Sequence, residues 1–469
     1  MNMDQAIFDL AIVDGTMVSS SSVFKGHLGV DQGRVVSVSR GLARPQARKT
    51  ISAEGKLVLP GVIDAHLHPV YADRMGRLSR AYAAGGVTTL VPYIGAFKAW
   101  GGTGGLKKSL DDFIAEGREK SLLDFSVHLS LNSQDLGELG STLEYAASLG
   151  VKSYKIFTAY QKRGMFLSDQ EILKVMTEVV RVGGLLAAHC ENGAVIDFFE
   201  DRAILAGRTS PEAFGSTHPD LSEAEAVFRF LCLAKMVDCP VYLPHLSTWQ
   251  ALEVLRLARS WAGPPIFAET CPHYLDLTDK LMGLWGTRAK VSPPLRSQEH
   301  LEPLWAALKG GLIDVVASDH AGHSSLAKAP HFSDVYQAPT GLPGGDLLLR
   351  VMYDRAVAKG RLSLPELVRL LCEKPARIFG LWPTKGSLEP GADADLVIFN
   401  PELERVIDGP NPLLKADYTL YHGKTLKGLP ELVIRGGEVI FENGRVVESN
   451  QPGRYLAAWF DHWPKTAKA

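Results

Sequence analysis

Two histidines separated by one residue, His66 and His68, have the type and spacing of metal ligands. They follow an apolar run, residues 56–60, in a stretch that predicts the end of a buried strand. Residues i and i+2 of a strand point to the same face, so the two imidazoles are expected to project side by side toward one metal ion. The pair alone is equally compatible with two histidines on a half-exposed strand face.

Other residues of metal-binding type follow further predicted strands. His189 and His245 each end an apolar run, and Asp319 follows another. The carboxyl ends of parallel strands in a barrel meet at one face, so these side chains are expected to converge. Singly, each histidine is compatible with a core position, and Asp319 with a helix cap. Together, the four histidines and the aspartate predict a two-metal site, because the ligands of a structural zinc would cluster in sequence.

Lys155 lies inside a strand-like run, where a charged ammonium is unfavourable. Burying it costs several kcal/mol even after relaxation, and two metal cations beside it would repel it. We therefore expect a neutral or chemically modified amine. A carbamate formed from the Lys155 amine and CO2 would be anionic and bidentate, and it could bridge two metal ions.

The elements that must position these residues alternate between strand and helix from about residue 60 to 380. Helical patterns cover 169–182, 223–237 and 363–372. This alternation predicts an α/β protein with a parallel sheet buried on both faces, and its length favours a (β/α)8 TIM barrel. A doubly wound open sheet is the alternative, although no Gly-x-Gly-x-x-Gly follows a first strand. The strand-like runs are 87–91, 125–129, 153–157, 185–189, 241–245 and 314–318.

Both ends of the chain are rich in short strands that cannot bury a core alone. We expect residues 1–58 and 386–450 to pair into one small β-sandwich domain beside a barrel of residues 59–385, with a C-terminal tail at 451–469. Asp14-Gly15 and Asn443-Gly444 each carry the signal of a tight hairpin turn.

The composition is that of an ordinary globular protein. Of 469 residues 22% are charged, and the formal net charge of −2 predicts neither a nucleic-acid nor a membrane partner. The N-terminus has no pattern of a signal peptide. The five cysteines are scattered without zinc-ribbon or Cys-x-x-Cys spacing, which fits reduced thiols in a cytoplasmic enzyme.

The sequence resembles the cyclic amidohydrolases of the amidohydrolase superfamily, most closely the hydantoinase/dihydropyrimidinase group. The resemblance runs over nearly the whole chain and implies an enzyme of the TIM-barrel class that acts on C–N bonds in cyclic amides. It is carried by the motifs at residues 61–68, 84–89, 155–160, 188–192, 245–247, 269–275, 292–296, 318–320, 375–380 and 391–397.

The resemblance also implies a role for each metal-type residue. One of two divalent ions would be bound more deeply than the other, and a carbamylated lysine would bridge both. Zinc is the expected metal, while manganese, cobalt and iron stay open. The implied ligands are His66, His68 and Asp319 for the deeper ion, His189 and His245 for the second, and Lys155 for the bridge.

By the same resemblance, a hydroxide that bridges the metals attacks the ring amide carbonyl. Asp319 then takes the hydroxide proton and passes it to the leaving nitrogen. Tyr160 donates its hydroxyl to the oxyanion, and Ser292 contacts the substrate amide. The partner is a small cyclic amide, and the family suggests a homotetramer or dimer.

Several positions depart from the family pattern and leave the substrate open. The loop at 69–80 is shorter than usual and lacks the usual apolar gate. Thr340 stands where an asparagine usually lines the ring, and Asp346 stands where a glutamate is expected. Val70 occupies the position of the arginine with which a dihydroorotase holds the carboxylate of its substrate, which argues against that activity and, less strongly, against other anionic ring substrates.

Three hypotheses follow. The first is a hydrolase that opens a hydantoin, a dihydropyrimidine or a related ring. The second is an allantoinase or another cyclic imide hydrolase, against which Tyr160 argues. The third is a non-catalytic assembly protein like the dihydropyrimidinase-related proteins, which have lost metal ligands that this chain keeps.

Overall fold

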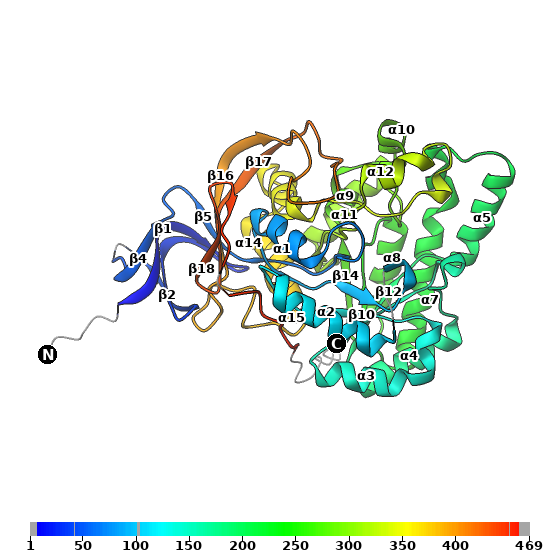
Figure 1. The fold of residues 1–469 in the computed structure, drawn as a ribbon, viewed down its shortest axis with the longest axis horizontal. Coiled ribbons are helices and arrows are strands. Elements are labelled where there is room, and N and C mark those ends of the chain that lie inside the picture. Colours follow the sequence, from blue (N-terminus) through cyan, green and yellow to red (C-terminus); the bar gives the residue numbers. More distant parts are fainter. Residues whose placement is uncertain (1–6, 42, 101–103, 450, 459–469) are drawn as a thin grey trace.

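The computed structural model describes residues 7–41, 43–100, 104–449 and 451–458. A strand-rich part lies at one end of the molecule, and a larger part surrounded by helices lies at the other (Figure 1). In the part of the chain that is described, no helix is long and apolar enough to span a membrane.

The strand-rich part joins the two ends of the chain in one nine-stranded sheet, ordered β19-β18-β17-β16-β5-β1-β2-β3 with β4 beside β1. In Figure 1 the blue N-terminal strands and the orange and red C-terminal strands lie side by side. Leu10 and Ile12 pack with Leu396 and Ile434 in one buried cluster, which confirms a small β-sandwich built from both ends. The strands are β1 Phe8–Val18, β2 Val23–Asp31, β3 Arg34–Arg40, β4 Ala47–Ser52, β5 Leu57–Pro60, β16 Leu396–Val406, β17 Thr425–Arg435, β18 Glu438–Glu442 and β19 Arg445–Val446.

The two turn signals had different outcomes. Asn443-Gly444 connects β18 to β19 as predicted, with both residues at positive φ. The hairpin predicted at Asp14-Gly15 is wrong, because β1 continues through it from Phe8 to Val18. The pairing of β1 with β2 shifts between Ile12 and Gly15, so the positive φ of Asp14 belongs to a bulge instead.

The larger part is a parallel barrel that begins with β6, directly after β5. A seven-stranded sheet runs β15-β14-β13-β12-β11-β10-β8, and a three-stranded sheet runs β6-β7-β9. A parallel bridge between Leu67 and His320 links the first strand to the last and closes the barrel. The strands are β6 Val62–Asp64, β7 Val87–Leu90, β8 Tyr93–Gly95, β9 Asp124–Phe125, β10 His128–Ser130, β11 Ser153–Phe157, β12 Leu185–His189, β13 Val241–Leu243, β14 Ile266–Thr270 and β15 Val315–Val316.

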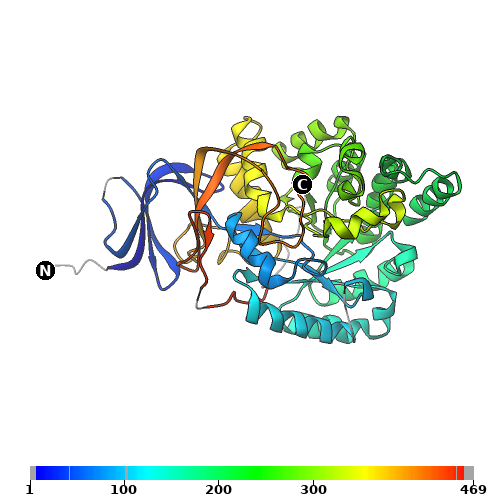
Figure 2. The same ribbon diagram turned by 45° about the horizontal axis from the view of Figure 1, so that its top comes forward.

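Helices pack around the outside of these strands (Figure 2). The predicted helices are confirmed as α4, α7 and α14, the last continuing in a π-helical turn at Arg369–Glu373. Ser168 begins α4 with a capping box to Glu171, which satisfies the free N–H groups of the first turn. The helices are α1 Met75–Ala84, α2 Leu106–Lys120, α3 Leu139–Ser148, α4 Asp169–Arg181, α5 Gly193–Leu205, α6 Phe214–Thr217, α7 Asp220–Met236, α8 Trp249–Arg259, α9 Pro272–Asp276, α10 Leu281–Trp285, α11 Leu301–Lys309, α12 Ser325–Lys328, α13 Leu348–Met352, α14 Leu364–Val368 and α15 Lys374–Ile378.

A buried ionic cluster ties the barrel, the β-sandwich and the tail together. The ammonium of Lys385 lies 2.6 Å from Asp124 of β9, 3.0 Å from Asp393 and 2.7 Å from Asp395. Arg454, in the tail, binds Asp124 at 2.6 Å, so residues 451–458 pack against the barrel of their own chain. The remainder of the predicted tail, 459–469, lies outside the described residues.

Candidate metal centre

The two histidines of the His-x-His pair follow β6, and their rings lie together at the carboxyl end of the barrel. The ring centroids of His66 and His68 are 5.3 Å apart. One carboxylate oxygen of Asp319 lies 3.1 Å from Nε2 of His66 and 3.3 Å from Nε2 of His68. All three residues are buried, and their ligand atoms lie within 4.8 Å of one another, as a common metal ion requires.

Lys155 joins this group from β11. Its Nζ lies 3.1 Å from Nε2 of His66, and the residue is buried. Burial lowers the pKa of the amine to about 8, against the opposing influence of Asp319 and Glu269. A buried amine with a lowered pKa is neutral more often than an ordinary lysine, which is the form that carbamate formation needs.

The other two predicted ligands face each other. Nδ1 of His189, at the end of β12, lies 3.1 Å from Nε2 of His245, after β13. The ring of His245 is also 5.4 Å from that of His66, so the four predicted imidazoles form one continuous group. Two imidazole nitrogens at this distance either share one hydrogen or both face a cation, and Glu191 at Nε2 leaves Nδ1 of His189 with its lone pair for such an ion.

Two carboxylates that the sequence analysis gave no role orient the imidazoles. Glu269, on β14, accepts a hydrogen bond from Nδ1 of His66 at 2.7 Å, so Nε2 keeps its lone pair for the cluster. Glu269 also accepts from the Tyr242 hydroxyl and from the backbone N–H of His245. Glu191 lies 2.8 Å from Nε2 of His189 and acts in the same way. Both glutamates lie in motifs that carry the resemblance. Their residue type and spacing, however, do not indicate that they orient the histidines.

The backbone at three predicted site residues is left-handed. The φ angles are +68° at Tyr160, +43° at His245 and +47° at Asp319, three of the seven non-glycine residues with positive φ in the described ranges. Such conformations cost about 1–3 kcal/mol each and persist where the surroundings hold them. They turn the side chains at the strand ends toward the centre, which no sequence pattern reveals.

Tyr160 and Ser292 lie together beside the imidazoles. The Tyr160 ring is 4.7 Å from that of His189, and its hydroxyl is hydrogen-bonded to Ser292. Burial raises the pKa of the Tyr160 phenol well above its usual value, so the hydroxyl stays protonated and can donate. Burial would also raise the pKa of Asp319, but His66, His68 and Lys155 outweigh it and hold the carboxylate ionised.

The short loop after His68 supplies an aromatic wall that the sequence analysis did not foresee. Val70 and Tyr71 pack against a buried cluster of Phe97, Trp100, Phe157 and Met165. Trp100 donates its indole N–H to the Tyr71 hydroxyl at 2.9 Å, and its ring lies 5.4 Å from that of His68. Tyr71 of residues 69–80 and Trp100 of a later segment therefore place aromatic side chains beside His68.

A second group with metal-ligand spacing, Asp220, Glu299 and His300, has a different character. Asp220 accepts a hydrogen bond from Arg296 at 3.1 Å, and its other oxygen lies 3.3 Å from His300. The Asp220 carboxylate is therefore already paired with the guanidinium of Arg296.

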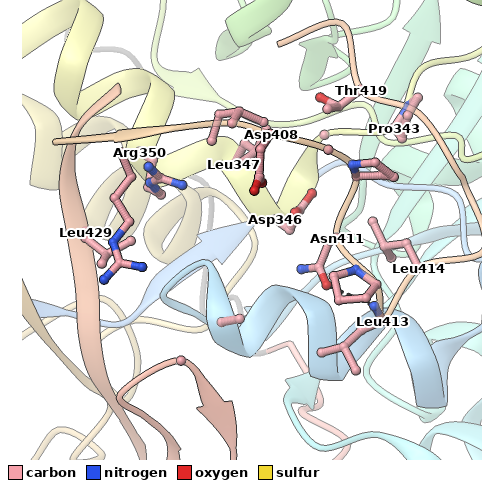
Figure 3. A pocket seen from close by; sticks show the side chains of 18 of the residues that line it. Pro343, Asp346, Leu347, Arg350, Asp408, Asn411, Leu413, Leu414, Thr419 and Leu429 are labelled. Atoms are coloured by element: carbon pink, nitrogen blue, oxygen red, sulfur yellow. Dashed lines mark hydrogen bonds between the residues drawn. The ribbon is translucent and has the colours of Figure 1, made fainter. Parts of the chain in front are cut away.

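A large groove of about 970 Å³ lies away from the predicted ligands, none of which lines it. Figure 3 shows Asp346, Arg350, Asp408 and Asn411 around it. The segment that carries Asp346 reaches the metal centre only indirectly, since Gly344 N lies 3.3 Å from the ring of His320. Asp346, which stands where the family pattern has a glutamate, therefore lines this groove and not the metal centre.

Comparisons with known proteins agree with this architecture. The model of the amidohydrolase family matches residues 167–440. A D-hydantoinase of Ralstonia pickettii is 33% identical, covering 96% of this chain and 98% of that protein. An L-hydantoinase of Paenarthrobacter aurescens is 32% identical, with the same coverage of 96% and 98%. The crystal structure of a dihydropyrimidinase from Brevibacillus agri superposes with a TM-score of 0.89 at 29% identity, covering 96% of this chain and 98% of that one.

The family model covers more than half of the chain, and these relatives align over nearly all of it. The barrel and the β-sandwich also agree with the related structure over 96% of the chain. The protein therefore belongs to the amidohydrolase family, whose members depend on metal ions.

Proposed function

We propose that the protein is a cyclic amidohydrolase that opens the ring amide bond of a hydantoin, a dihydropyrimidine or a related ring. The observation that carries this proposal is the convergence of His66, His68 and Asp319, with the Lys155 amine 3.1 Å from His66. The names of the relatives, D-hydantoinase, L-hydantoinase and dihydropyrimidinase, support the choice of ring.

The donor set fits two divalent cations. His66, His68 and Asp319 would hold one, His189 and His245 the other, and Lys155, as its carbamate, would bridge them. Imidazole and carboxylate donors suit zinc. When bound, such ions polarise the ring carbonyl and lower the pKa of a water from ~15.7 toward ~7.

The side chains of the protein supply the remaining steps. The ionised Asp319 accepts a proton from the attacking water and delivers it to the ring nitrogen as that bond breaks. Tyr160 donates its hydroxyl hydrogen to the carbonyl oxygen, on which negative charge develops. Ser292 fixes that phenol by a hydrogen bond and presents its backbone to the ring amide.

The retained ligands separate this proposal from the non-catalytic alternative. All six predicted ligand residues are present and buried, and each contacts another member of the group. An assembly protein on the same scaffold would have no need of such a group. The cytoplasmic location and the homo-oligomer remain predictions from the sequence.

A ring-opening screen tests the proposal. Purified, metal-loaded protein is incubated with dihydrouracil, 5-substituted hydantoins, allantoin and simple cyclic imides, and the addition of one water to each ring is measured by mass spectrometry. Turnover of hydantoins or dihydrouracil is the expected result. Turnover of allantoin alone would support the allantoinase alternative, and no turnover with two metals bound would contradict the proposed ring class.

A further inference from the structure

A chain of contacts runs from one predicted ligand, His68, to another, His189, along the carboxyl end of the barrel. We call its residues the rim: His68, Tyr71, His323, Thr340, Arg163, Tyr160 and His189. Along it, the ring centroids of His68 and Tyr71 are 6.5 Å apart, and those of Tyr71 and His323 are 4.4 Å apart. His323 Nε2 then lies 3.1 Å from the carbonyl oxygen of Thr340.

Arg163 completes the rim between Thr340 and Tyr160. Its guanidinium donates to the Thr340 hydroxyl at 3.3 Å and lies 5.0 Å from the centre of the Tyr160 ring. Tyr160 in turn lies 4.7 Å from His189. A ring bound beside the Tyr160 hydroxyl would therefore lie close enough for a short substituent to reach the Arg163 guanidinium.

Arg163 is the one rim residue with a permanent charge. Burial lowers the pKa of His323 to about 4, which leaves its imidazole neutral. Arg163 has no ion pair within 4 Å among the described residues; the neighbouring Lys162, by contrast, lies 2.7 Å from Asp201 and 3.6 Å from Asp197. Glu200, which feels the charge of Arg163, is itself 3.9 Å from Lys162. The guanidinium is therefore free to bind an anion.

Two buried lysines lie behind the rim and have no ion pair within 4 Å among the described residues; burial lowers the pKa of Lys290 to about 7 and that of Lys328 well below its usual value. Lys328 donates to the backbone carbonyls of Lys290 and Gly341 at 2.9 and 2.5 Å. Lys290 donates to the carbonyls of Val335 and Ala338 at 2.8 and 2.7 Å. These bonds hold together the segments that carry Ser292 and Thr340. Glu200 interacts electrostatically with Arg163 and Lys290, but it lies 3.9 Å from Lys162 and makes no ion pair with Arg163 within 4 Å.

We infer that Arg163 selects a cyclic substrate whose ring substituent ends in a carboxylate. This inference rests on the proposed function and names its substrate class more narrowly. A dihydroorotase-like site would have an arginine two residues after His68. This chain has Val70 there, so that cation is absent. Arg163 offers a cation from a different loop, after β11, so the carboxylate would stand on a flexible substituent and not on the ring itself. The aromatic wall of Tyr71 and Trp100 would cover the apolar part of that substituent.

A matched pair of substrates tests the inference. Hydantoins with a 2-carboxyethyl or a 2-carbamoylethyl group at C5 have nearly the same shape and differ in charge. We expect the wild type to prefer the carboxylate by about tenfold in kcat/KM, the lower end of the range of one charge-assisted hydrogen bond, because Arg163 is exposed in the free protein. The preference should fall as salt is raised. Arg163→Gln should bring the ratio of the two values to about 1, Arg163→Glu should bring it below 1, and Arg163→Lys should retain part of it.

Lys162→Gln is the control, because it removes an adjacent exposed cation that is already paired with α5 and should leave the ratio unchanged. A wild-type ratio near 1, or a preference that survives in Arg163→Gln, would overturn the inference. The affinities of the two compounds for the metal-loaded protein are also measured by calorimetry. If neither ring is opened, the proposed function fails. The ratio of the two affinities would still show whether Arg163 binds the carboxylate. Equal affinities, or no binding of either compound, would overturn its role.

Discussion

Nδ1 of His66 lies 2.7 Å from a carboxylate oxygen of Glu269, which also accepts a hydrogen bond from the backbone of His245. One buried carboxylate thus orients two predicted ligands, one for each metal ion. We predict that Glu269→Gln weakens metal binding about 10- to 100-fold, because the amide can no longer accept from His66 as a carboxylate does. Metal content after dialysis against graded chelator measures the effect. Tyr242→Phe, which removes only a donor to Glu269, should show a smaller loss, and unchanged binding in both variants would contradict this role.

Lys155→Ala should lose metal and activity together, because the bridging group is gone. Short-chain carboxylates added with the metal should restore part of both by filling the space as an anionic bridge. The metal-to-protein ratio and the ring-opening rate are measured in parallel. Full metal content at the wild-type rate in this variant would show that Lys155 does not bridge.

The pKa of about 8 at Lys155 predicts how the metal-free enzyme is reconstituted. Only the neutral amine reacts with CO2, and below pH 8 its fraction falls about tenfold per pH unit. Recovery of activity with metal and bicarbonate should therefore speed up as the pH rises from 6 to 8, and then level off. Stopped-time assays of reloading at fixed dissolved CO2 measure this. A rate that is independent of pH and of CO2 would exclude carbamate formation as the limiting step.

Tyr160→Phe should lower turnover by roughly 10²–10³ without a change in metal content, because it removes one donor to the developing oxyanion. Tyr154→Phe is a matched control: this tyrosine is also buried, but its hydroxyl donates to the backbone carbonyl of Val151 at 3.0 Å, away from the centre. Steady-state kinetics with metal analysis separates the two effects. An unchanged rate in Tyr160→Phe would remove the phenol from the mechanism.

The barrel and the ligand-type residues at its strand ends could be predicted from the sequence because both follow from strong local signals. Apolar runs ending in His189 and His245, and the spacing of His66 and His68, place metal-type residues at strand ends before any contact is known. Turn chemistry was less certain: Asp14-Gly15 and Asn443-Gly444 look alike locally, yet pairing of β1 with β2 converts the first into a bulge. Tertiary packing decides between them.

Other features of the site depend on contacts between distant segments. The support of His66 by Glu269 spans 203 residues, and the bond from Arg163 to Thr340 spans 177. The aromatic wall joins Tyr71 to Trp100 from separate loops. The left-handed backbone at His245 and Asp319 has no signature in residue type, since it is imposed by the surrounding fold.

The Lys385 cluster should make stability depend on acid pH. Burial would raise the pKa of Asp124, but Lys385 and Arg454 outweigh it and hold the pKa at about 2, below the usual 3.8. This contribution is present above pH 4 and is lost as the pH falls toward 2. Lys385→Met should cost about 3–5 kcal/mol at neutral pH, because it leaves buried carboxylates without their partner.

Denaturant unfolding from pH 7 to pH 3 measures both effects. The difference between the wild type and Lys385→Met should shrink as the carboxylates become protonated. Lys108→Met is the control, since it removes an exposed ion pair with Asp112 and should change stability by less than about 1 kcal/mol. A pH-independent difference would show that charge pairing at Lys385 does not carry the stability.

The central claim is that two metal ions, held by the convergent histidines, Lys155 and Asp319, carry the opening of a cyclic amide. The most direct measurement titrates metal-free protein with zinc in the presence of bicarbonate, and follows ring opening of a 5-substituted hydantoin at each step. We predict no turnover without metal and a rate that reaches its maximum at two ions per chain. Full turnover in the presence of a strong chelator, or a maximum with no metal bound at the centre, would contradict it.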